Sequence, residues 1–542
     1  MTTQISTTAI TTPLANIAQT VLEAVIALGV SEFCISPSAR NAALVYPLVN
    51  ADHVRIYHWT EERSSAFFAL GRIKATGKPV AVVTTSGTAV AELLPSTMEA
   101  YYSGLPLILI TADRPRHFRG SGAPQTVEQV GIFGPYVHLM LDVQEGEEFY
   151  LKQWNGRGPL HINVCLNEPQ DALCQSMRLT TNIHKPFIPS PIPFLIDQHY
   201  LHFLKNCHHP LIIVSALAQH EQEAVVALLQ HIGAPVYLES TSGLREVTSI
   251  AHLQITQIHK IWQHAAKHGY HIDGILRIGG VPTARLWRDL EEKNDIIVHS
   301  ISALPFVGSS VGTLFQTTLA QFVNWATSIP KFYDYQYENW QAADKKAHHE
   351  LMELLYCEPQ AEPSLVWSLS QKLPEKAKIY LGNSLPIREW DFAASLQTRH
   401  FQVAANRGVN GIDGQLATFL GYSCSAQSNW AILGDLTLIY DLAAPWITSQ
   451  LKDCFLQVIV INNGGAAIFK SMFNHPVFQS KHNISFQPLA ALWQWQYKKW
   501  ETIPTHIATA TDKATLIEII PCAEATERFW QKYYLMLDRC LL

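Results

Sequence analysis

Two polar segments, each directly after an apolar run, carry the residues best suited to chemistry: Gly434-Asp435-Leu436-Thr437 and Asn462-Asn463-Gly464-Gly465. The apolar runs are typical of buried parallel strands, here joined by a predicted crossover helix at 441–451. Carboxylate, amide and carbonyl oxygens are ligands that Mg²⁺ and Ca²⁺ prefer, and such an ion can hold a diphosphate. We therefore predict a metal site that uses Asp435 and Asn463 at the ends of two strands.

The elements that would position these segments alternate between short apolar strands and helical patterns. In the first third of the chain, strands are predicted at 33–35, 55–58, 79–84 and 105–111, and helices at 15–28, 61–75 and 88–102. This alternation is typical of a parallel sheet with helices on both faces, so the chain is placed in the α/β class.

Length and two proline-containing stretches divide the chain into three predicted domains. At 542 residues the chain is too long for one hydrophobic core. Linkers are predicted at 186–194 and 359–363, and the domains at 13–185, 196–350 and 361–542. The first and third domains share a general α/β pattern, which would suit a duplicated fold.

Composition narrows the class of protein. Hydrophobic residues make up 48 % of the chain and charged residues 15 %, which is typical of a well-buried enzyme. Because the net charge is −6, no nucleic-acid partner is expected. The nine cysteines lack metal-binding spacing and fit reduced thiols in a cytoplasmic protein. Neither a signal peptide nor an apolar run suited to an integral membrane segment is expected.

The two polar segments, with Asp435 and Asn463 28 positions apart, resemble the signature of thiamine-diphosphate (ThDP) enzymes. Such enzymes also need a buried carboxylate that hydrogen-bonds to the aminopyrimidine ring, so that C2 of the cofactor can lose its proton. The candidate is Glu62, near the start of the helix predicted at 61–75, where burial would raise its pKa. Glu61 is interpreted as an acid that complements the helix dipole.

Motifs spread over nearly the whole chain resemble one ThDP family. They are PSAR at 37–40, SGTAVA at 86–91, ADRP at 112–115, GNS at 382–384, NRG at 406–408 and GIDG at 411–414. In order and spacing they are similar to the MenD family of 2-succinyl-5-enolpyruvyl-6-hydroxy-3-cyclohexene-1-carboxylate (SEPHCHC) synthases. The resemblance implies three doubly wound parallel-sheet domains: pyrimidine-binding, central and diphosphate-binding. It also implies decarboxylation of 2-oxoglutarate and 1,4-addition of the succinyl carbanion to isochorismate, in menaquinone biosynthesis.

The resemblance implies cofactor-site roles for residues of this chain. Mg²⁺, with Mn²⁺ as an alternative ion, would be bound by Asp435, Asn463 and the Gly465 carbonyl. The residues that would contact ThDP or its surroundings are Glu62, Ser384, Ile412, Gly434, Leu436, Thr437, Ile468 and Phe469. Ile412 would hold the cofactor bent, and the last two residues would also line the substrate pocket.

Both implied substrates carry two carboxylates, which arginine can bind through paired hydrogen bonds. The arginines on or near matching positions are Arg40, Arg114, Arg285, Arg388 and Arg407. The match at Arg285 requires a gap. Gln125 matches a catalytic-site residue that contacts the reaction intermediate. The family's site lies between the first domain of one chain and the third of another, so a homodimer or homotetramer is expected.

Three positions depart from the family pattern. Ala39, Pro124 and Ala284 stand where serine, asparagine and lysine are usual, so the substrate shell has lost polar groups. A missing partner for a buried polar group costs about 1–3 kcal/mol. Two alternatives therefore stay open: a related ThDP-dependent 2-oxoacid decarboxylase or carboligase with other substrates, and a non-catalytic ThDP-binding homologue. Retention of Glu62 argues against the second.

Overall fold

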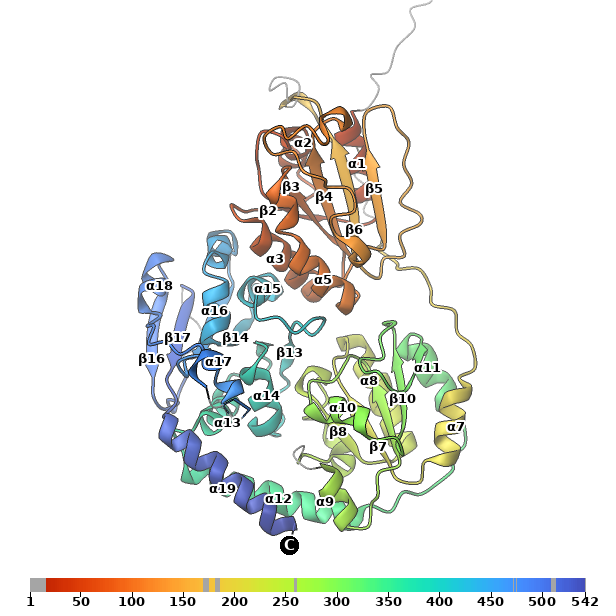
Figure 1. The fold of residues 1–542 in the computed structure, drawn as a ribbon, viewed down its shortest axis with the longest axis vertical. Helices are drawn as coiled ribbons and strands as arrows, with labels where there is room; N and C mark the ends of the chain where they lie inside the picture. Colours follow the sequence, from red (N-terminus) through yellow and green to blue (C-terminus); the bar gives the residue numbers. More distant parts are fainter. Residues whose placement is uncertain are drawn as a thin grey trace, which may run out of the picture.

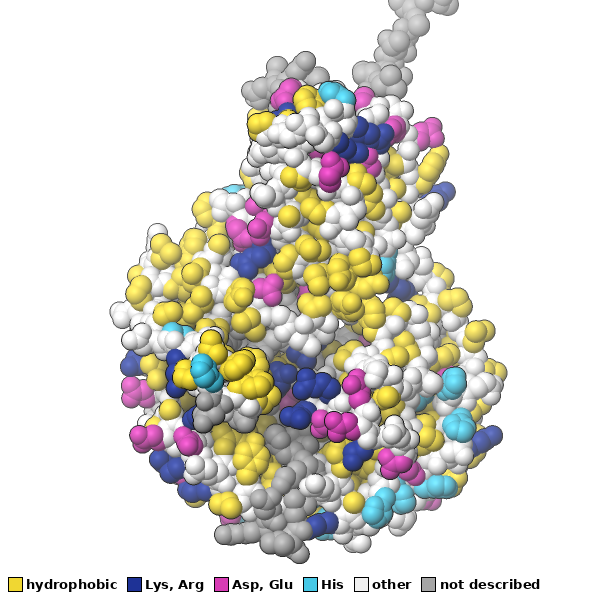
Figure 2. Space-filling view, viewed as in Figure 1, with side chains coloured by type: hydrophobic (Ala, Val, Ile, Leu, Met, Phe, Trp, Pro, Cys, Tyr) yellow, Lys and Arg dark blue, Asp and Glu magenta, His cyan; other side chains and the backbone are white. Residues whose placement is uncertain are grey.

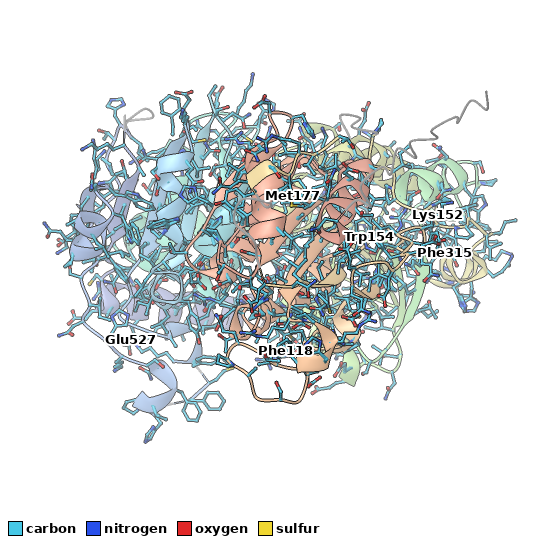
Figure 3. All side chains as sticks on the ribbon, turned by 90° about the horizontal axis from the view of Figure 1, so that it is seen from above. Phe118, Lys152, Trp154, Met177, Phe315 and Glu527 are labelled. Atoms are coloured by element: carbon cyan, nitrogen blue, oxygen red, sulfur yellow. The ribbon has the colours of Figure 1, made fainter. Side chains whose placement is uncertain are left out.

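The computed structural model describes residues 16–168, 175–180, 186–257, 261–470, 472–473, 475–507 and 513–541. These residues form three α/β units, each built on a parallel sheet, so the predicted fold class is confirmed. The first unit lies above the other two (Figure 1). Seen from above, Met177 of the first unit lies between Glu527 of the third and Phe315 of the second (Figure 3). The predicted domain limits 13, 185 and 542 lie outside the described residues.

The first unit has a six-stranded sheet in the order β2-β1-β3-β4-β6-β5. Its strands are β1 (Glu32–Ile35), β2 (Arg55–His58), β3 (Val80–Thr84), β4 (Leu107–Asp113), β5 (Leu139–Val143) and β6 (Leu160–Cys165). Its helices are α1 (Ile17–Ala27), α2 (Ala42–Val49), α3 (Glu62–Thr76), α4 (Thr88–Ala91) and α5 (Leu94–Ser103). Every residue of β3 and β4 is buried, as expected of central parallel strands.

The second unit has a five-stranded sheet in the order β11-β10-β9-β7-β8. Its strands are β7 (Pro210–Val214), β8 (Val236–Leu238), β9 (Gly274–Ile278), β10 (Ile297–Ser302) and β11 (Thr313–Gln316). Its helices are α7 (Gln198–Asn206), α8 (Gln222–Ile232), α9 (Ile261–Lys267), α10 (Arg285–Asp289) and α11 (Leu319–Ala326). Helix α12 (Glu338–Cys357) then leads to the third unit.

The third unit has a six-stranded sheet in the order β13-β12-β14-β15-β17-β16. Its strands are β12 (Lys378–Leu381), β13 (Gln402–Ala404), β14 (Ser428–Gly434), β15 (Phe455–Ile461), β16 (Gln496–Trp500) and β17 (Thr515–Ile519). Its helices are α13 (Glu362–Lys372), α14 (Leu385–Ala393), α15 (Gln415–Tyr422), α16 (Asp435–Tyr440), α17 (Pro476–Gln479), α18 (Gln487–Leu492) and α19 (Ala523–Leu541), with 3-10 helices η7 (Ala444–Gln450) and η8 (Ala467–Phe469).

The sheets of the first and third units share one topology. When strands are counted from the first strand of each sheet, both read 2-1-3-4-6-5. In a parallel sheet all strands end at the same edge, and ligands bind outside that edge. The repeated order therefore gives each of the two units one edge at which functional loops gather, and it supports the expected duplicated pattern.

Helices α3 and α15 pack backbone to backbone and join the first unit to the third. A Cβ added at Gly71 would lie 2.0 Å from the Thr418 carbonyl oxygen, and one at Gly421 would lie 2.1 Å from the Phe68 carbonyl oxygen. Only glycine permits so close an approach. Apolar side chains of both units form one continuous core around this crossing, among them Phe67, Phe68, Leu416 and Leu420.

The predicted elements are largely confirmed, with two corrections. The four strands predicted in the first unit correspond to β1–β4. The helix predicted at 88–102 is two helices, α4 and α5, with Pro95 in the first turn of the second. The crossover helix predicted at 441–451 is wrong, because α16 begins at Asp435 and a 3-10 helix with Pro445 in its first turn follows. Among the described helices, none is long and apolar enough to cross a membrane.

Candidate active site

Asp435 and Asn463 lie beyond neighbouring strand ends, as the sequence predicts. Strands β14 and β15 pair in parallel as far as Gly434 and Ile461, so the segments that follow leave the same edge of the sheet. Asp435 then begins helix α16. The juxtaposition of the two side chains therefore follows from parallel pairing of two buried apolar strands.

The Asp435 carboxylate is held by backbone N–H groups. Oδ1 accepts a hydrogen bond from Leu436 N at 2.6 Å, and Oδ2 accepts from Gly464 N at 3.0 Å and Gly465 N at 2.9 Å. Burial raises the pKa of Asp435, whereas these hydrogen bonds oppose the rise. The sequence Asn-Asn-Gly-Gly thus anchors the loop after β15 onto the carboxylate that follows β14.

Two buried polar atoms beside Asp435 lack a hydrogen-bond partner in the described chain. Asn463 Oδ1 is one, and His482 Nε2 is the other, at 3.2 Å from Asp435 Oδ2 but without hydrogen-bond geometry. Buried polar atoms are normally satisfied, so an orphaned amide oxygen next to a carboxylate indicates a missing ligand. An oxygen pair of this kind fits a hard divalent cation.

The turn at this edge depends on glycine. Gly465 has a φ of +138°, and a Cβ there would lie 2.3 Å from the Gln479 carbonyl oxygen. Its own carbonyl accepts a hydrogen bond from Ala467 N at 3.0 Å, which leaves one lone pair available. Gly434, the N-cap residue of α16, and the buried Thr437 complete the turn on the β14 side.

Ser384, Arg388 and Arg407 come together near the ends of β12 and β13. Arg388 Nη1 donates to the Ser384 carbonyl at 2.7 Å, and Arg407 Nη1 donates to Asn383 Oδ1 at 2.6 Å. Ser384 has a positive φ of 70°, an uncommon conformation outside glycine. Burial lowers the pKa of Arg388, and the positive charge of Arg407 adds to that effect.

A cationic hollow marks the boundary of the second and third units. Figure 2 shows Lys and Arg side chains gathered there. Arg288 of α10 lies near enough to Arg388 for its positive charge also to lower the pKa of Arg388. Arg285, the residue selected from the sequence, is instead 73 % exposed in its side chain and bonds Asp289 through Nε at 3.3 Å. The structure therefore places Arg285 apart from Arg388, in an ion pair within its own helix.

Three apolar candidates of the third unit are partly open. Ile412 lies in the loop before α15 and is half-buried. Ile468 and Phe469 form part of η8, and Phe469 is 39 % exposed. The segment after them carries further exposed apolar side chains: Met472, Phe473, Val477 and Phe478. The structure thus places an open apolar surface directly after the Asn463 loop.

Glu62 begins helix α3 at the carboxyl end of β2 in the first unit. Burial raises its pKa, and the neighbouring carboxylates of Glu61 and Glu92 raise it further. Among the described residues, the Glu62 carboxylate has no hydrogen-bond partner in another residue, and a hydrogen bond from its own backbone N–H opposes the rise. Glu61 is the N-cap of the helix and accepts from Arg63 N and Ser64 N at 3.0 and 2.9 Å. The two adjacent acids therefore differ in environment.

Arg40 and Arg114 converge on one carboxylate. Glu168 Oε1 lies 2.5 Å from Arg40 Nη2 and 3.3 Å from Arg114 Nη1, and the Glu168 side chain is 75 % exposed. Gln125 lies on the loop whose Pro124 carbonyl accepts from Arg114 Nε at 3.2 Å. Gln125 is exposed and has a positive φ of 55°. These predicted residues are thus brought together by the loops after β1 and β4.

Comparison with known proteins agrees with this architecture. Residues 15–132 match the family model described as thiamine pyrophosphate enzyme, N-terminal TPP binding domain. A solved chain from Mycobacterium smegmatis, described as a thiamin diphosphate-dependent enzyme, superposes with a TM-score of 0.67. It is 14 % identical and covers 93 % of this chain and 99 % of its own. At that identity the likeness shows the fold.

Curated relatives decide the family. The SEPHCHC synthase of Bdellovibrio bacteriovorus is 40 % identical over 529 residues, which cover 96 % of this chain and 99 % of that protein. The chain belongs to the SEPHCHC synthase family. The SEPHCHC synthase of Akkermansia muciniphila is 36 % identical and covers 92 % of this chain and 95 % of its own. The expected family is therefore confirmed over nearly the full length.

In this member of the SEPHCHC synthase family the candidate residues form two separate groups. Glu62, Arg40, Arg114 and Gln125 lie at the edge of the first sheet. The remaining candidates, Arg285 aside, lie at the edge of the third sheet. Among the described residues, no hydrogen bond or ion pair links a side chain of one group to one of the other. The two groups are therefore separate within the described part of one chain.

Two buried acids behind the candidate metal site were not predicted from the sequence. Both oxygens of Glu362 accept from Asn463 Nδ2, at 3.0 and 3.2 Å, and Glu389 is hydrogen-bonded to Glu362. Residues 359–363 were predicted as a linker, yet α13 begins at Glu362 with Pro363 in its first turn. Pro363 could have indicated this helix start, since proline favours the first turn of a helix.

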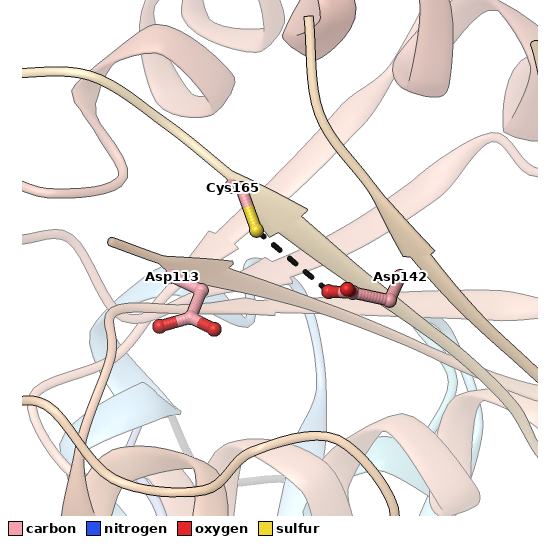
Figure 4. A group of neighbouring side chains, drawn as sticks. All are labelled: Asp113, Asp142 and Cys165. Carbon is pink, nitrogen blue, oxygen red and sulfur yellow. Dashed lines mark hydrogen bonds between the residues drawn. The ribbon is translucent and has the colours of Figure 1, made fainter. Parts of the chain in front are cut away.

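Another acidic cluster of the enzyme is hydrogen-bonded to an arginine and needs no metal ion. Asp113, Asp142 and Cys165 lie at the ends of β4, β5 and β6 (Figure 4). Arg119 Nη2 lies 2.6 Å from Asp142 Oδ1 and 3.3 Å from both Asp113 Oδ2 and Cys165 Sγ. Burial would raise the pKa of Asp142, but hydrogen bonds from Arg119 and Asn163 outweigh it and lower that pKa to about 2. The Arg119 guanidinium therefore takes the place of a metal ion in this cluster.

Proposed function

We propose that the protein is a SEPHCHC synthase that uses ThDP and Mg²⁺, with Mn²⁺ as an alternative ion, to join 2-oxoglutarate and isochorismate. The observation that carries the proposal is the orphaned oxygen of Asn463 beside Asp435, in a chain 40 % identical to a relative named for this activity. The family favours this function over a ThDP enzyme with other substrates.

The third unit would hold the cation and the diphosphate. Asp435 and Asn463 would bind Mg²⁺ through side-chain oxygens and Gly465 through its free carbonyl lone pair. The residues that would contact the diphosphate at this edge are Ser384, Gly434, Leu436 and Thr437. The half-buried Ile412 would support the cofactor rings, and Ile468 and Phe469 would exclude water from them.

The first unit would supply the proton relay. ThDP, when bound, supplies a carbanion that can attack the carbonyl of a 2-oxoacid. Glu62 would hydrogen-bond to the aminopyrimidine ring and exchange one proton with it. Burial raises the pKa of this carboxyl and so favours its protonated form, which is the form that donates the hydrogen bond.

Arginines would bind the substrate carboxylates from both sides. Arg40 and Arg114 already share the exposed Glu168 carboxylate, which shows that their guanidinium groups can bind one carboxylate together. Arg388 and Arg407 offer a second cationic position, with Gln125 as a neutral hydrogen-bonding partner for the reacting substrate. Arg285 would reach this position only if its ion pair with Asp289 opened.

Two copies of the chain would complete each site. Glu62 and Asp435 lie at the edges of different sheets, and no hydrogen bond or ion pair joins them among the described residues. Exposed apolar side chains follow the loop that carries Asn463: Phe469, Met472, Phe473, Val477 and Phe478. A homodimer, or a homotetramer made of two dimers, would bring the first unit of one copy over the third unit of the other. The predicted domain limits are retained as part of this proposal.

The deciding experiment is an assay of isochorismate consumption with 2-oxoglutarate, ThDP and Mg²⁺, each omitted in turn. We expect loss of isochorismate only with all components present, together with a product of SEPHCHC mass. Asp435→Ala should weaken Mg²⁺ and ThDP binding together. Binding of ThDP without isochorismate consumption would instead favour other substrates, which a panel of 2-oxoacids would identify.

A further inference from the structure

A buried glutamate lies directly behind the candidate metal ligand Asn463. Glu362 is 3 % exposed, and its two carboxylate oxygens lie 3.0 and 3.2 Å from Asn463 Nδ2. Its backbone N–H donates to Thr526 Oγ1 at 3.0 Å, which fixes the start of α13. The carboxylate is therefore held in place from its own helix while it faces the amide.

Chemistry decides which way the amide of Asn463 points. Both Glu362 oxygens face the same atom of Asn463, and a carboxyl group always has at least one oxygen without a proton, so that atom must be the NH₂ group. The carbonyl oxygen then points away from Glu362, and this is the oxygen that has no partner. Without Glu362 nothing in the described surroundings of Asn463 distinguishes the two orientations of the amide.

The partner of Glu362 on its far side is Glu389 of α14. The two carboxyls are joined by a hydrogen bond, and Glu389 Oε2 has no further partner among the described residues. The proton that the two carboxyls share lies between them and not toward Asn463. Glu362 then has only acceptor oxygens to offer Asn463.

We propose that Glu362 is a positioning residue that orients the Asn463 amide so that Oδ1 is presented to the cation. Glu362 does not touch the cation itself. Partners behind a metal ligand typically contribute 10–100-fold to metal affinity by fixing ligand orientation. The inference rests on the proposed function, because it requires the cation site at Asp435 and Asn463.

The test measures Mn²⁺ affinity rather than turnover. Enzyme freed of metal is titrated with Mn²⁺ in the presence of ThDP, and free Mn²⁺ is followed by electron paramagnetic resonance. Glu362→Gln should raise the Kd for Mn²⁺ about tenfold, because the amide can offer Asn463 only one acceptor and also carries a competing donor. The melting temperature of metal-free enzyme should change little. An unchanged Kd would overturn the inference.

A double variant distinguishes orientation from general damage. In E362Q/N463D the donor and acceptor are exchanged: the new amide donates to the new carboxylate, which keeps its second oxygen for the cation. We expect this variant to bind Mn²⁺ more tightly than either single variant. Equal or weaker binding in the double variant would overturn the inference. Should E362Q fail to fold, the comparison of E362Q/N463D with N463D alone carries the same test.

Two further variants separate this inference from the proposed function. Glu358→Gln removes one negative charge four positions earlier, where Glu358 pairs with Arg528 and Lys532. This variant should bind Mn²⁺ with a Kd within about twofold of the wild-type value. Asp435→Ala tests the site itself. If Asp435→Ala leaves Mn²⁺ affinity unchanged, the proposed metal site fails; if it abolishes binding while E362Q has no effect, only the role of Glu362 fails.

Discussion

At the scale of single residues, the adjacent acids Glu61 and Glu62 have different environments. Glu61 and Glu62 follow each other in the chain, but Glu61 accepts hydrogen bonds from Arg63 N and Ser64 N, whereas Glu62 accepts one only from its own backbone N–H among the described residues. Burial raises the pKa of Glu62, and the Glu61 carboxylate is occupied as the cap of the helix. Only Glu62 is therefore suited to exchange a proton with a cofactor.

This difference predicts opposite phenotypes for two matched substitutions. Glu62→Gln should lower kcat by at least about 100-fold, because the amide cannot exchange the proton. Circular dichroism and ThDP affinity should stay close to wild type. Glu61→Gln should retain activity and lose up to about 2 kcal/mol of stability as the cap weakens. Activity is measured as isochorismate consumption and stability by thermal melting, for both variants. Full activity of Glu62→Gln would refute the assigned role.

Residue positions were predictable where backbone geometry dictates them. Asp435 and Asn463 follow two strongly apolar strands, so parallel pairing alone brings them together. The role of Arg285 stays a prediction: its exposed side chain pairs with Asp289, whereas the charge of Arg288 lowers the pKa of Arg388. Glu362 was missed because its role arises from a hydrogen bond to a residue 101 positions away. No local pattern encodes such a contact.

At the scale of elements, the strand pair β4 and β6 contains a buried histidine. His161 Nε2 lies 2.8 Å from Thr111 Oγ1, and the ring lies 4.7 Å from that of Phe133. Burial lowers the pKa of His161 to about 3. In the unfolded chain the imidazole has its ordinary pKa of about 6.5. The unfolded state therefore gains a proton first as the pH falls.

The sign of this linkage predicts a loss of stability in mild acid. Above about pH 6.5 His161 is neutral in both states and contributes nothing to the pH dependence. Below that pH, each unit lowers the free energy of unfolding by up to about 1.4 kcal/mol until the folded pKa is reached. His161→Gln should flatten the fall in melting temperature between about pH 7.5 and about pH 5.5. The exposed His220→Gln is the control, and an equal slope in both variants would contradict the assignment.

The crossing of α3 and α15 gives a second prediction for elements. Gly71→Ala should force these helices apart and cost about 1–3 kcal/mol. Hydrogen exchange should then increase in α15 as well as in α3, since the added methyl group meets Thr418 and Tyr422. Gly77→Ala, at the C-cap of α3 with nothing within 4 Å, should cost about 1 kcal/mol through backbone strain. Protection of α15 that is unchanged by Gly71→Ala would contradict this packing.

Elements were predictable in kind more reliably than in extent. Apolar runs of the first unit correspond to β3 and β4, because central parallel strands must be apolar on both faces. The helix expected at 441–451 was wrong because α16 starts at the metal-loop residue Asp435 itself. Pro445 then lies in the first turn of a 3-10 helix, where its missing N–H is tolerated. Helical spacing alone does not locate such a boundary.

At the scale of the whole molecule, the division of the site predicts complementation. Glu62→Gln chains and Asp435→Ala chains should each form inactive homodimers. A heterodimer purified through two different tags contains one site with both defects and one with neither. It should regain about half of wild-type activity. A heterodimer as inactive as its parents would place Glu62 and Asp435 of one site in the same chain.

The shared core between the first and third units also governs how the chain is made. Phe67 and Phe68 pack against Leu416 and Leu420, which are roughly 350 positions later in the sequence. At bacterial rates of about 5–20 residues per second, the ribosome needs roughly 20–70 s to supply those partners. Throughout that interval the nascent first unit displays an apolar helix face with nothing to cover it. We therefore expect a chaperone that covers α3 until α15 leaves the exit tunnel to raise the yield of folded protein.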